Sequence, residues 1–291
     1  MTILQAIFLG LVQGLTEFIP VSSTAHLVFA SRLVSLYADA ADKTLQAEQT
    51  TATIAVIQLG TLLAVLVYFA RDIVNILRAF IFDHLALLRG RKERGLSRDA
   101  WLGWLVIIGS LPVGTIGLLL KKQIEGPFTK NLWVIATMMI VVGVLLAIAE
   151  FVGRRSKDMD QLGVGDALAV GSAQVLALIP GSSRSGSTIM AGLFAGQTRE
   201  TAARFSFLLS IPAIAASGLL ELKEAVHKLP AGSYGSLAVA TIVSGVVGYA
   251  SIWFLLRYLR THSTGVFIVY RVIVGGLILA ALSLGYMSAS I

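Results

Sequence analysis

Near the N-terminus the sequence reads Gln13-Gly-Leu-Thr-Glu17-Phe-Ile-Pro20-Val-Ser22-Ser23-Thr24-Ala-His26, which sets a carboxylate, hydroxyls and an imidazole within apolar sequence. A second stretch, Pro180-Gly-Ser182-Ser183-Arg184-Ser185-Gly-Ser-Thr188, repeats its Pro-x-Ser-Ser core. The spacing of further pairs is nearly constant: Gln13 and Gln174 lie 161 residues apart, and Pro20/Pro180 and Ser22/Ser182 lie 160 apart. The chain is therefore expected to contain two copies of one structural unit.

The composition of the 291-residue chain is that of an integral membrane protein. Apolar residues make up 56% of it and charged residues 13%, whereas soluble proteins carry about 25% charged residues. The net charge of +7 is explained by loop charges that orient membrane spans; no basic stretch interleaved with aromatic residues indicates a nucleic-acid partner. The absence of cysteine excludes disulfides and cysteine-ligated metal. The N-terminus lacks a basic segment and a cleavage site, so we expect no cleaved signal peptide.

The first stretch is expected to form a re-entrant helical hairpin over residues 3–36. The apolar run before Gln13 has about ten residues, which at about 1.5 Å per residue crosses only half of a hydrocarbon core of about 30 Å. Pro20 then breaks the helix, and a second short helix returns the chain to the side that it entered. Non-helical backbone at this depth is tolerated only where protein encloses it. Residues 165–195 predict an equivalent hairpin around Pro180.

Three apolar segments long enough to span a membrane follow each hairpin. They are residues 53–70, 101–120, 131–152, 205–220, 237–256 and 264–286, with residues 38–50 and 71–98 as loops. An odd number of crossings inverts the second half, 161–291, relative to the first, 1–160, within a single membrane domain. The predicted fold is all-α, with six transmembrane helices, two re-entrant hairpins and an inverted internal repeat, a plan typical of secondary transporters.

Basic residues assign the loops to the two sides of the membrane. The proposed cytoplasmic loops hold 14 Lys or Arg, seven of them between Arg71 and Arg98, and the proposed outer loops hold six. These six are Lys43, Lys121, Lys122, Lys130, Lys223 and Lys228. By the positive-inside rule, the first hairpin enters from the outer side and the second from the cytoplasm.

Gln13 and Glu17 lie four residues apart, so a helix presents both on one face. A carboxylate within the membrane is costly and by default marks a functional site. Mg²⁺ takes one or two carboxylates and completes its coordination with water and phosphate oxygens, which makes Gln13 and Glu17 candidate metal ligands. The structural alternatives are a Glu17–Arg184 pair that only holds the hairpins together and an interhelical hydrogen bond of Gln13.

Ser22, Ser23 and Thr24 follow a helix breaker and could serve only as caps of the returning helix. Ser23 differs because His26, three residues on, shares its helical face. This pair favours a nucleophile with its general base, or an attacking His26 with Ser23 binding an oxygen. Ser22 and Thr24 are candidate substrate-binding residues.

The second stretch combines the groups that a phosphate requires. Arg184 offers a planar cationic fork, and the flanking glycines leave backbone N–H groups free at the start of a helix. The hydroxyls around it are candidate substrate ligands, with helix capping as the alternative: Ser182, Ser183, Ser185 and Thr188. Arg271, in the last span, either binds substrate in the same site or reaches toward a membrane interface.

Together the two stretches resemble the membrane undecaprenyl-pyrophosphate phosphatase family, also known for bacitracin resistance. Its Glu/Gln-x-x-x-Glu element is similar to Gln13-Gly-Leu-Thr-Glu17, and its Pro-Gly-x-Ser-Arg-Ser-x-x-Thr element is similar to residues 180–188. The run Thr-Glu-Phe-Ile-Pro-Val-Ser-Ser-Thr-Ala-His and the plan of spans also resemble the family across nearly the whole chain.

The resemblance implies an enzyme of the bacterial plasma (inner) membrane that hydrolyses undecaprenyl pyrophosphate to the monophosphate carrier of cell-wall synthesis, with a site open to the outer face. It implies a divalent cation, Mg²⁺ or Ca²⁺, and functional roles for Glu17, Ser23, His26 and Arg184, with Gln13 where a second Glu is frequent. The expected partners are the polyprenyl pyrophosphate and membrane lipid, and a homodimer is left open. Transport of a polyprenyl phosphate or small anion is the competing hypothesis, because inverted repeats are typical of transporters.

Overall fold

A computed structural model describes residues 1–37, 43–90, 95–120, 131–229 and 231–289, and in these residues the chain is helical without a strand. Six helices of the described part are long and apolar enough to cross a membrane. They lie in α3 (Lys43–Tyr68), α5 (Arg98–Leu119), α7 (Leu132–Val152), α10 (Arg199–Lys228), α11 (Tyr234–Leu259) and α12 (Gly265–Ser283). The predicted all-α membrane fold with six spans is confirmed, whereas re-entry of the hairpins and inversion of the second half stay predictions.

Two pairs of short helices hold the polar stretches between them. The first pair is α1 (Ile3–Thr16) and α2 (Ser23–Leu33); the second is α8 (Val164–Gln174), continued by the 3₁₀ turn η3 (Val175–Leu178), and α9 (Arg184–Phe194). Thr2 starts α1 with a capping box, in which its hydroxyl accepts from the backbone N–H of Gln5 and its own N–H donates to the Gln5 side chain. Such caps satisfy N–H groups that have no partner within a helix.

Three of the predicted loops contain helix instead. Residues 43–50 belong to α3, and α10 extends to Lys228, so Lys223 and Lys228 are helical. The predicted loop 71–98 is largely occupied by α4 (Ala70–Leu88). Its apolar residues recur at helical spacing, and Ile76 and Phe80 pack against Gly103 of α5. A loop was predicted here because the segment is rich in Lys and Arg. The helical spacing of its apolar residues, however, indicates an amphipathic helix. Lys121, Lys122 and Lys130 lie outside the described residues.

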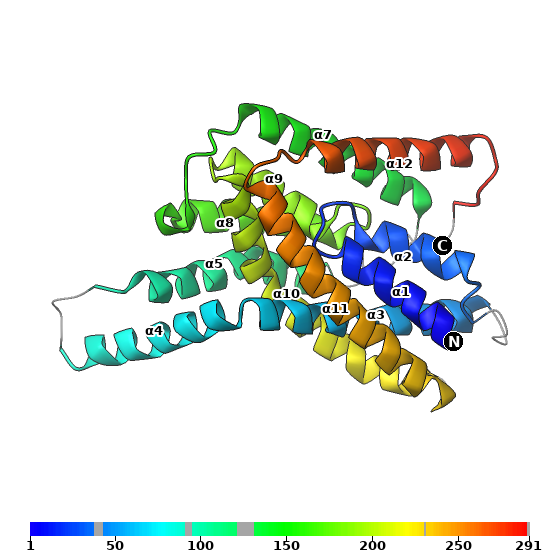
Figure 1. The fold of residues 1–291 in the computed structure, drawn as a ribbon, viewed down its shortest axis with the longest axis horizontal. Helices are drawn as coiled ribbons and strands as arrows, with labels where there is room; N and C mark the ends of the chain where they lie inside the picture. The colour runs from blue at the N-terminus through cyan, green and yellow to red at the C-terminus, as the bar shows by residue number, and fades with distance from the viewer. Residues whose placement is uncertain (38–42, 91–94, 121–130, 230, 290–291) are drawn as a thin grey trace.

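The helices of one half pack against those of the other. The helix α1 lies against α11, and its counterpart α8 lies against α5, while α3 contacts α10 and α7 runs beside α12 (Figure 1). Small residues allow the closest approaches: a Cβ on Gly60 of α3 would lie 2.1 Å from the carbonyl oxygen of Thr241, and one on Gly171 of α8 would lie 2.1 Å from that of Gly109. Close backbone contact of this kind stabilises helix pairs in membranes.

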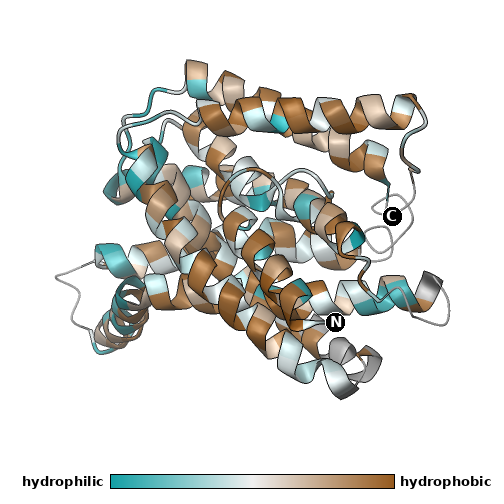
Figure 2. Cartoon of the chain, turned by 45° about the vertical axis from the view of Figure 1, so that its right-hand side comes forward, coloured by the Kyte–Doolittle hydropathy of each residue, from teal (hydrophilic) through white to brown (hydrophobic). Residues whose placement is uncertain are grey.

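The outward faces of the long helices are apolar. Figure 2 shows hydrophobic residues along most of their length and hydrophilic residues gathered toward helix ends and connections. Large apolar side chains such as Val246, Trp253 and Ile273 are more than half exposed. These faces fit hydrocarbon, so the buried polar residues of the two hairpins lie inside an otherwise apolar protein.

Candidate active site

Each polar stretch turns through a serine with left-handed backbone. Ser22 has φ 77° and Ser183 has φ 67°, and each directly precedes the first residue of a helix, Ser23 in α2 and Arg184 in α9. The equivalent serines are therefore Ser22 and Ser183, 161 residues apart, rather than the Ser22/Ser182 pair aligned from sequence. A positive φ is costly for a residue with a side chain, so its occurrence at both turns marks them as one repeated design.

Glu17 joins the two turns. It ends α1, its side chain is 6% exposed, and one carboxylate oxygen, Oε1, accepts a hydrogen bond from the Arg184 guanidinium. The other oxygen, Oε2, accepts from Ser23 Oγ at 2.9 Å and from Gln13 Nε2 at 3.0 Å. The structure thus brings four predicted site residues together, and the predicted meeting of Glu17 with Arg184 is confirmed.

Ser23 and His26, predicted to share a helical face, bond to different partners in this structure, and their roles as nucleophile and base stay predictions. Ser23 donates to Glu17, because an ionised carboxylate is the stronger acceptor. The left-handed turn at Ser22 brings its carbonyl oxygen to 2.7 Å from His26 Nδ1, and the Tyr270 hydroxyl lies 2.6 Å from His26 Nε2. The imidazole therefore faces away from Ser23.

Burial is the main cause that lowers the pKa of His26, which lies in α2, outside the six spanning helices. The positive charge of Arg271 lowers this pKa further, and the hydrogen bond with the Ser22 carbonyl opposes both. The imidazole is consequently neutral at pH 7 and retains a lone pair on one nitrogen.

Gln13 is a candidate cation ligand by its chemistry. It is 1% exposed, and its Nε2 donates to Glu17 and, at 3.3 Å, to Thr61 Oγ1 of α3. Its Oε1 is buried and accepts no hydrogen bond from any described residue. The described residues hold no cluster of three or more His, Asp or Glu, so Gln13 and Glu17 fit only a cation that takes its remaining oxygens from water and a phosphate.

The hydroxyls near Arg184 shape the second turn. Ser182 Oγ donates to the Ile179 carbonyl oxygen at 2.7 Å, and Ser183 Oγ caps α9 by accepting from the backbone N–H of Gly186 at 3.1 Å. Ser185 Oγ lies 3.2 Å from Ser183 Oγ. The capping alternative is thus confirmed for Ser183, and contact of these serines with substrate stays a prediction.

The remaining predicted hydroxyls differ in exposure. Thr188 Oγ1 is buried, donates to the Arg184 carbonyl oxygen at 2.8 Å and contacts Ser206 Oγ. Ser22 Oγ is buried and makes no hydrogen bond within the described part of the chain. Thr24 is exposed in the first turn of α2. Of the three, only Thr24 has the exposure that direct contact with a ligand requires in this conformation.

Arg271 binds the backbone of both turns. The side chain is fully buried, which excludes the predicted alternative of a cation that reaches an interface. Its guanidinium donates to five carbonyl oxygens at 3.0 to 3.3 Å: those of Pro20, Gly181 and Ser182 in the turns and of Met138 and Met139 in α7. These bonds fix the turns against α7; the predicted contact of Arg271 with substrate stays a prediction.

Two residues beside the site were missed from sequence. Thr61 of α3 binds Gln13, and Tyr270 of α12 binds His26. Both are polar residues within apolar spans, which is the signal that identified Gln13 and Glu17. Thr61 has a polar neighbour at helical spacing in Gln58, but nothing in the sequence connects either residue with its partner in a distant helix.

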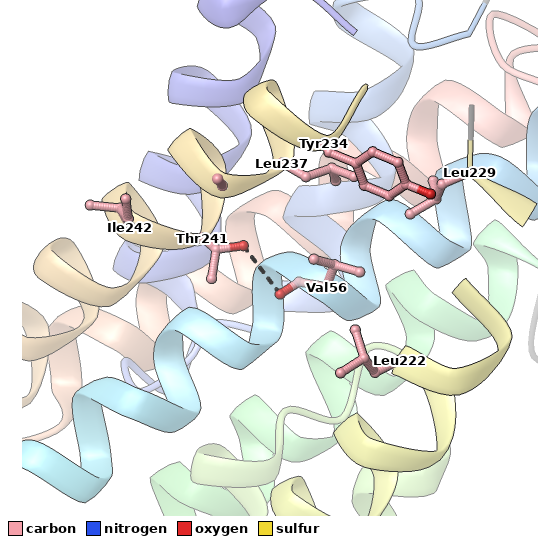
Figure 3. Close-up of a pocket in the computed structure, with 8 residues that line it drawn as sticks. Val56, Leu222, Leu229, Tyr234, Leu237, Thr241 and Ile242 are labelled. Carbon is pink, nitrogen blue, oxygen red and sulfur yellow. Dashed lines mark hydrogen bonds between the residues drawn. The ribbon is translucent and has the colours of Figure 1, made fainter. Parts of the chain in front are cut away.

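A groove of about 600 Å³ opens beside the site between α1, α2 and α12. Its wall carries His26 and Tyr270, and the rest is mainly apolar, including Phe8, Val12, Phe29 and Val274. A second pocket, of about 370 Å³, lies between α3, α10 and α11 and holds none of the predicted site residues (Figure 3). Its one drawn hydrogen bond runs from Thr241 Oγ1 to the Val56 carbonyl oxygen at 3.4 Å.

Comparison with known proteins places the chain in a family. The model of the family described as bacitracin resistance protein BacA matches residues 6–277, which include both turns and Arg271. The chain belongs to the BacA family. Similar BacA relatives include a protein of Syntrophobacter fumaroxidans named undecaprenyl-diphosphatase, 53% identical over 96% of this chain and 97% of that protein. Proteins of Mycolicibacterium gilvum and Mycobacterium ulcerans with the same name are each 48% identical, over 99% and 98% of this chain and 100% and 99% of theirs.

Proposed function

We propose that this protein is an undecaprenyl-diphosphatase, which hydrolyses undecaprenyl pyrophosphate to undecaprenyl phosphate and inorganic phosphate. Membership of the BacA family and relatives of that name over nearly the full chain support this activity. The main observation in favour of this site is that the Arg184 guanidinium and the Ser23 hydroxyl both donate hydrogen bonds to the carboxylate of Glu17. A cation for phosphate oxygens, a hydroxyl nucleophile and an acceptor for its proton thus lie within one network.

In the proposed first step, Ser23 Oγ attacks the terminal phosphorus while its proton passes to Glu17 Oε2, 2.9 Å away. The bond from that phosphorus to the bridging oxygen breaks, and undecaprenyl phosphate leaves with the proton that Glu17 returns. Arg184 moves from Glu17 onto the phosphate oxygens and stabilises their charge. Ser23 is favoured over His26 as the nucleophile because both imidazole nitrogens are engaged, one by Ser22 and one by Tyr270.

In the second step, water attacks the phosphorus of phosphoserine 23. Once the imidazole of His26 has turned from Tyr270 toward Ser23, its Nε2 takes a proton from this water and returns it to the departing Ser23 Oγ, so that free phosphate and the original hydroxyl are regenerated. Tyr270 must release Nε2 for this transfer. Its partly exposed position on the groove wall allows that movement.

Gln13 Oε1 and Glu17 are the residues that would hold a divalent cation, Mg²⁺ or Ca²⁺. A bound cation would withdraw charge from phosphate oxygens. The buried Gln13 oxygen without a described donor supports this assignment, since a buried acceptor is rarely left unsatisfied.

The groove beside His26 is the proposed path of the polyprenyl tail. It is mainly apolar and opens toward the exposed apolar faces of the spans, so a lipid could extend its tail sideways while its diphosphate enters between the turns. We further place the protein in the bacterial plasma membrane with the site facing outward, as its membership of the BacA family supports; the uneven distribution of Lys and Arg among the loops orients the spans. The homodimer left open by the sequence stays a prediction.

Phosphate release by the purified protein from a long-chain prenyl pyrophosphate, with Mg²⁺ or Ca²⁺ supplied, tests the proposal. Arg184→Ala should reduce release by about 100-fold or more, because the main charge stabilisation is lost. The matched control is Arg260→Ala, since Arg260 forms an exposed ion pair with Glu200. Full activity of a folded Arg184→Ala protein would show that the proposed active site is wrong.

Transport of a polyprenyl phosphate is the alternative, and the packing of each half against the other favours it. Liposomes that hold the protein distinguish the two. Lipid transfer between leaflets without phosphate release would favour transport, and phosphate release without transfer would favour hydrolysis.

A further inference from the structure

The hydrogen bonds of His26 define which of its nitrogens carries the proton. A backbone carbonyl can only accept, so the 2.7 Å contact with the Ser22 carbonyl oxygen requires a proton on Nδ1. In a neutral imidazole the other nitrogen, Nε2, is then an acceptor. The Tyr270 hydroxyl, 2.6 Å from Nε2, must be the donor of that bond.

Tyr270 also fixes the plane of the imidazole. The two rings are stacked, with centroids 5.6 Å apart and an angle of 15° between their planes. Stacking on one side and a hydrogen bond at each nitrogen leave the ring a single orientation. Since α12 carries Tyr270 and α2 carries His26, this contact connects helices 244 residues apart in sequence.

The charged groups near His26 are two cations, which disfavour protonation of the imidazole, and one carboxylate that is paired with a cation. Arg271 acts from α12, the same helix as Tyr270. Arg32 lies further along α2 and lines the same groove, whose described lining contains no carboxylate. Glu17 is paired with Arg184. Beyond these, Tyr270 itself is the titratable group that contacts the imidazole among the residues that the structure describes.

We propose that Tyr270 is a positioning residue that acts through His26: its hydroxyl holds Nε2 as the acceptor and keeps the imidazole neutral and oriented at the wall of the groove. The bond to Nε2 stabilises the neutral ring over the imidazolium, which cannot accept it. Tyr270 is 41% exposed on the groove wall, so an entering lipid meets this hydroxyl before it meets His26. This inference rests on the proposed function for its effect on catalysis, but its effect on the imidazole can be measured without activity.

Tyr270→Phe tests the inference because it keeps the stacked ring and removes only the hydroxyl. One hydrogen bond contributes about 0.5–1.5 kcal/mol, so its loss should move the acid limb of kcat toward higher pH by about 0.4–1 unit, at 1.36 kcal/mol per unit. The matched control is Tyr258→Phe. Tyr258 is also stacked on a histidine, His262, with ring centroids 4.5 Å apart and an angle of 13° between the ring planes, but this pair lies away from the site. That control should keep the wild-type pH profile.

A second measurement uses nitrogen NMR of the protein labelled with ¹⁵N at its four histidines, with the His26 signal assigned by its loss in His26→Asn. The wild type should show the Nδ1–H form of His26. In Tyr270→Phe we expect the Nδ1–H form to persist, because Nδ1 still donates to the Ser22 carbonyl oxygen, and the imidazole to be protonated at higher pH than in the wild type. An unchanged His26 spectrum and an unchanged acid limb would overturn the inference. Absence of phosphate release from the wild type would instead overturn the proposed function, and the NMR result would still decide the role of Tyr270.

Discussion

Glu17 is the residue on which the chemistry of the site converges. Its two oxygens accept from Arg184, Ser23 and Gln13, so one carboxylate connects α1, α2 and α9. Sequence reasoning predicted the meeting of Glu17 with Arg184, because mirrored polar stretches within apolar sequence have few other partners. It could not predict the neighbours of His26, since the left-handed turn at Ser22 redirects the imidazole toward a residue at the far end of the chain.

The proposed nucleophile can be located directly. Rapid quenching during turnover in a denaturant at neutral pH, where both phosphoserine and phosphohistidine survive, followed by mass spectrometry, should find a phosphate on Ser23 of the wild type. Ser23→Ala should lack this phosphate and lose activity by about 10⁴-fold or more, because the proposed nucleophile is removed. Thr51→Ala is the control, since Thr51 is an exposed threonine of α3 whose hydroxyl donates only to the Ala47 carbonyl oxygen. Phosphate on His26 instead would show that the nucleophile has been misassigned.

The pH dependence of turnover should report His26. Burial lowers its pKa, so the catalytically useful neutral imidazole persists below the ordinary histidine value of about 6.5. Activity should therefore be level near neutral pH and fall only as the pH drops through the lowered pKa. A profile of kcat against pH, measured at saturating substrate, checks the direction of this change. An acid limb above pH 7 would contradict it.

At the scale of elements, the two turns are held by one buried cation. The Arg271 guanidinium donates to the turn carbonyls of Pro20, Gly181 and Ser182 as well as to α7. This role is invisible in sequence because backbone carbonyls leave no pattern of residue types. The six spans were predictable because a long apolar run is seldom anything other than a membrane span. The helix α4 was missed because the many basic residues of segment 71–98 are typical of a loop, despite the helical spacing of its apolar residues.

Arg271→Lys should loosen both turns together. A lysine has three donors on one nitrogen and cannot reach five carbonyls spread around a planar fork. We expect a fall in kcat of about 10-fold or more and a lower melting temperature in detergent, since each buried acceptor left unpaired costs about 1–3 kcal/mol. Arg257→Lys, at an exposed position over Trp253, is the control. Equal stability and activity of the two variants would show that the five bonds are dispensable.

Glu150, near the C-terminal end of α7, connects this helix with α10 and α12. It accepts from Arg199 of α10 and from the backbone N–H (3.2 Å) and Oγ1 (2.7 Å) of Thr264 at the start of α12. Glu150→Gln should destabilise the protein by about 1–3 kcal/mol, because the amide cannot satisfy all these donors. Melting curves measure the loss, and kcat should stay within about threefold because no contact with the site is broken. A collapse of kcat in a fully folded variant would refute this separation.

At the scale of the whole molecule, the halves are joined through glycine contacts between helices of different halves. Gly60→Ala would force α3 away from α11, since the new Cβ would lie 2.1 Å from the Thr241 carbonyl oxygen. We expect a clear loss of thermal stability and of protein yield. Gly276→Ala is the matched control, because no described atom lies within 4 Å of its Cβ position. Equal melting temperatures for the two variants would mean that the close contact is unimportant.

The cross-packing of the halves has a consequence for biosynthesis. The helix α1 packs against α11, which is translated more than 200 residues later. Until then its polar end, with Gln13 and Glu17, has neither its neighbour Arg184 nor the helix that covers its glycines. A nascent chain stalled after α7 would therefore hold Glu17 with its donors Gln13 and Ser23 but without its cationic partner Arg184.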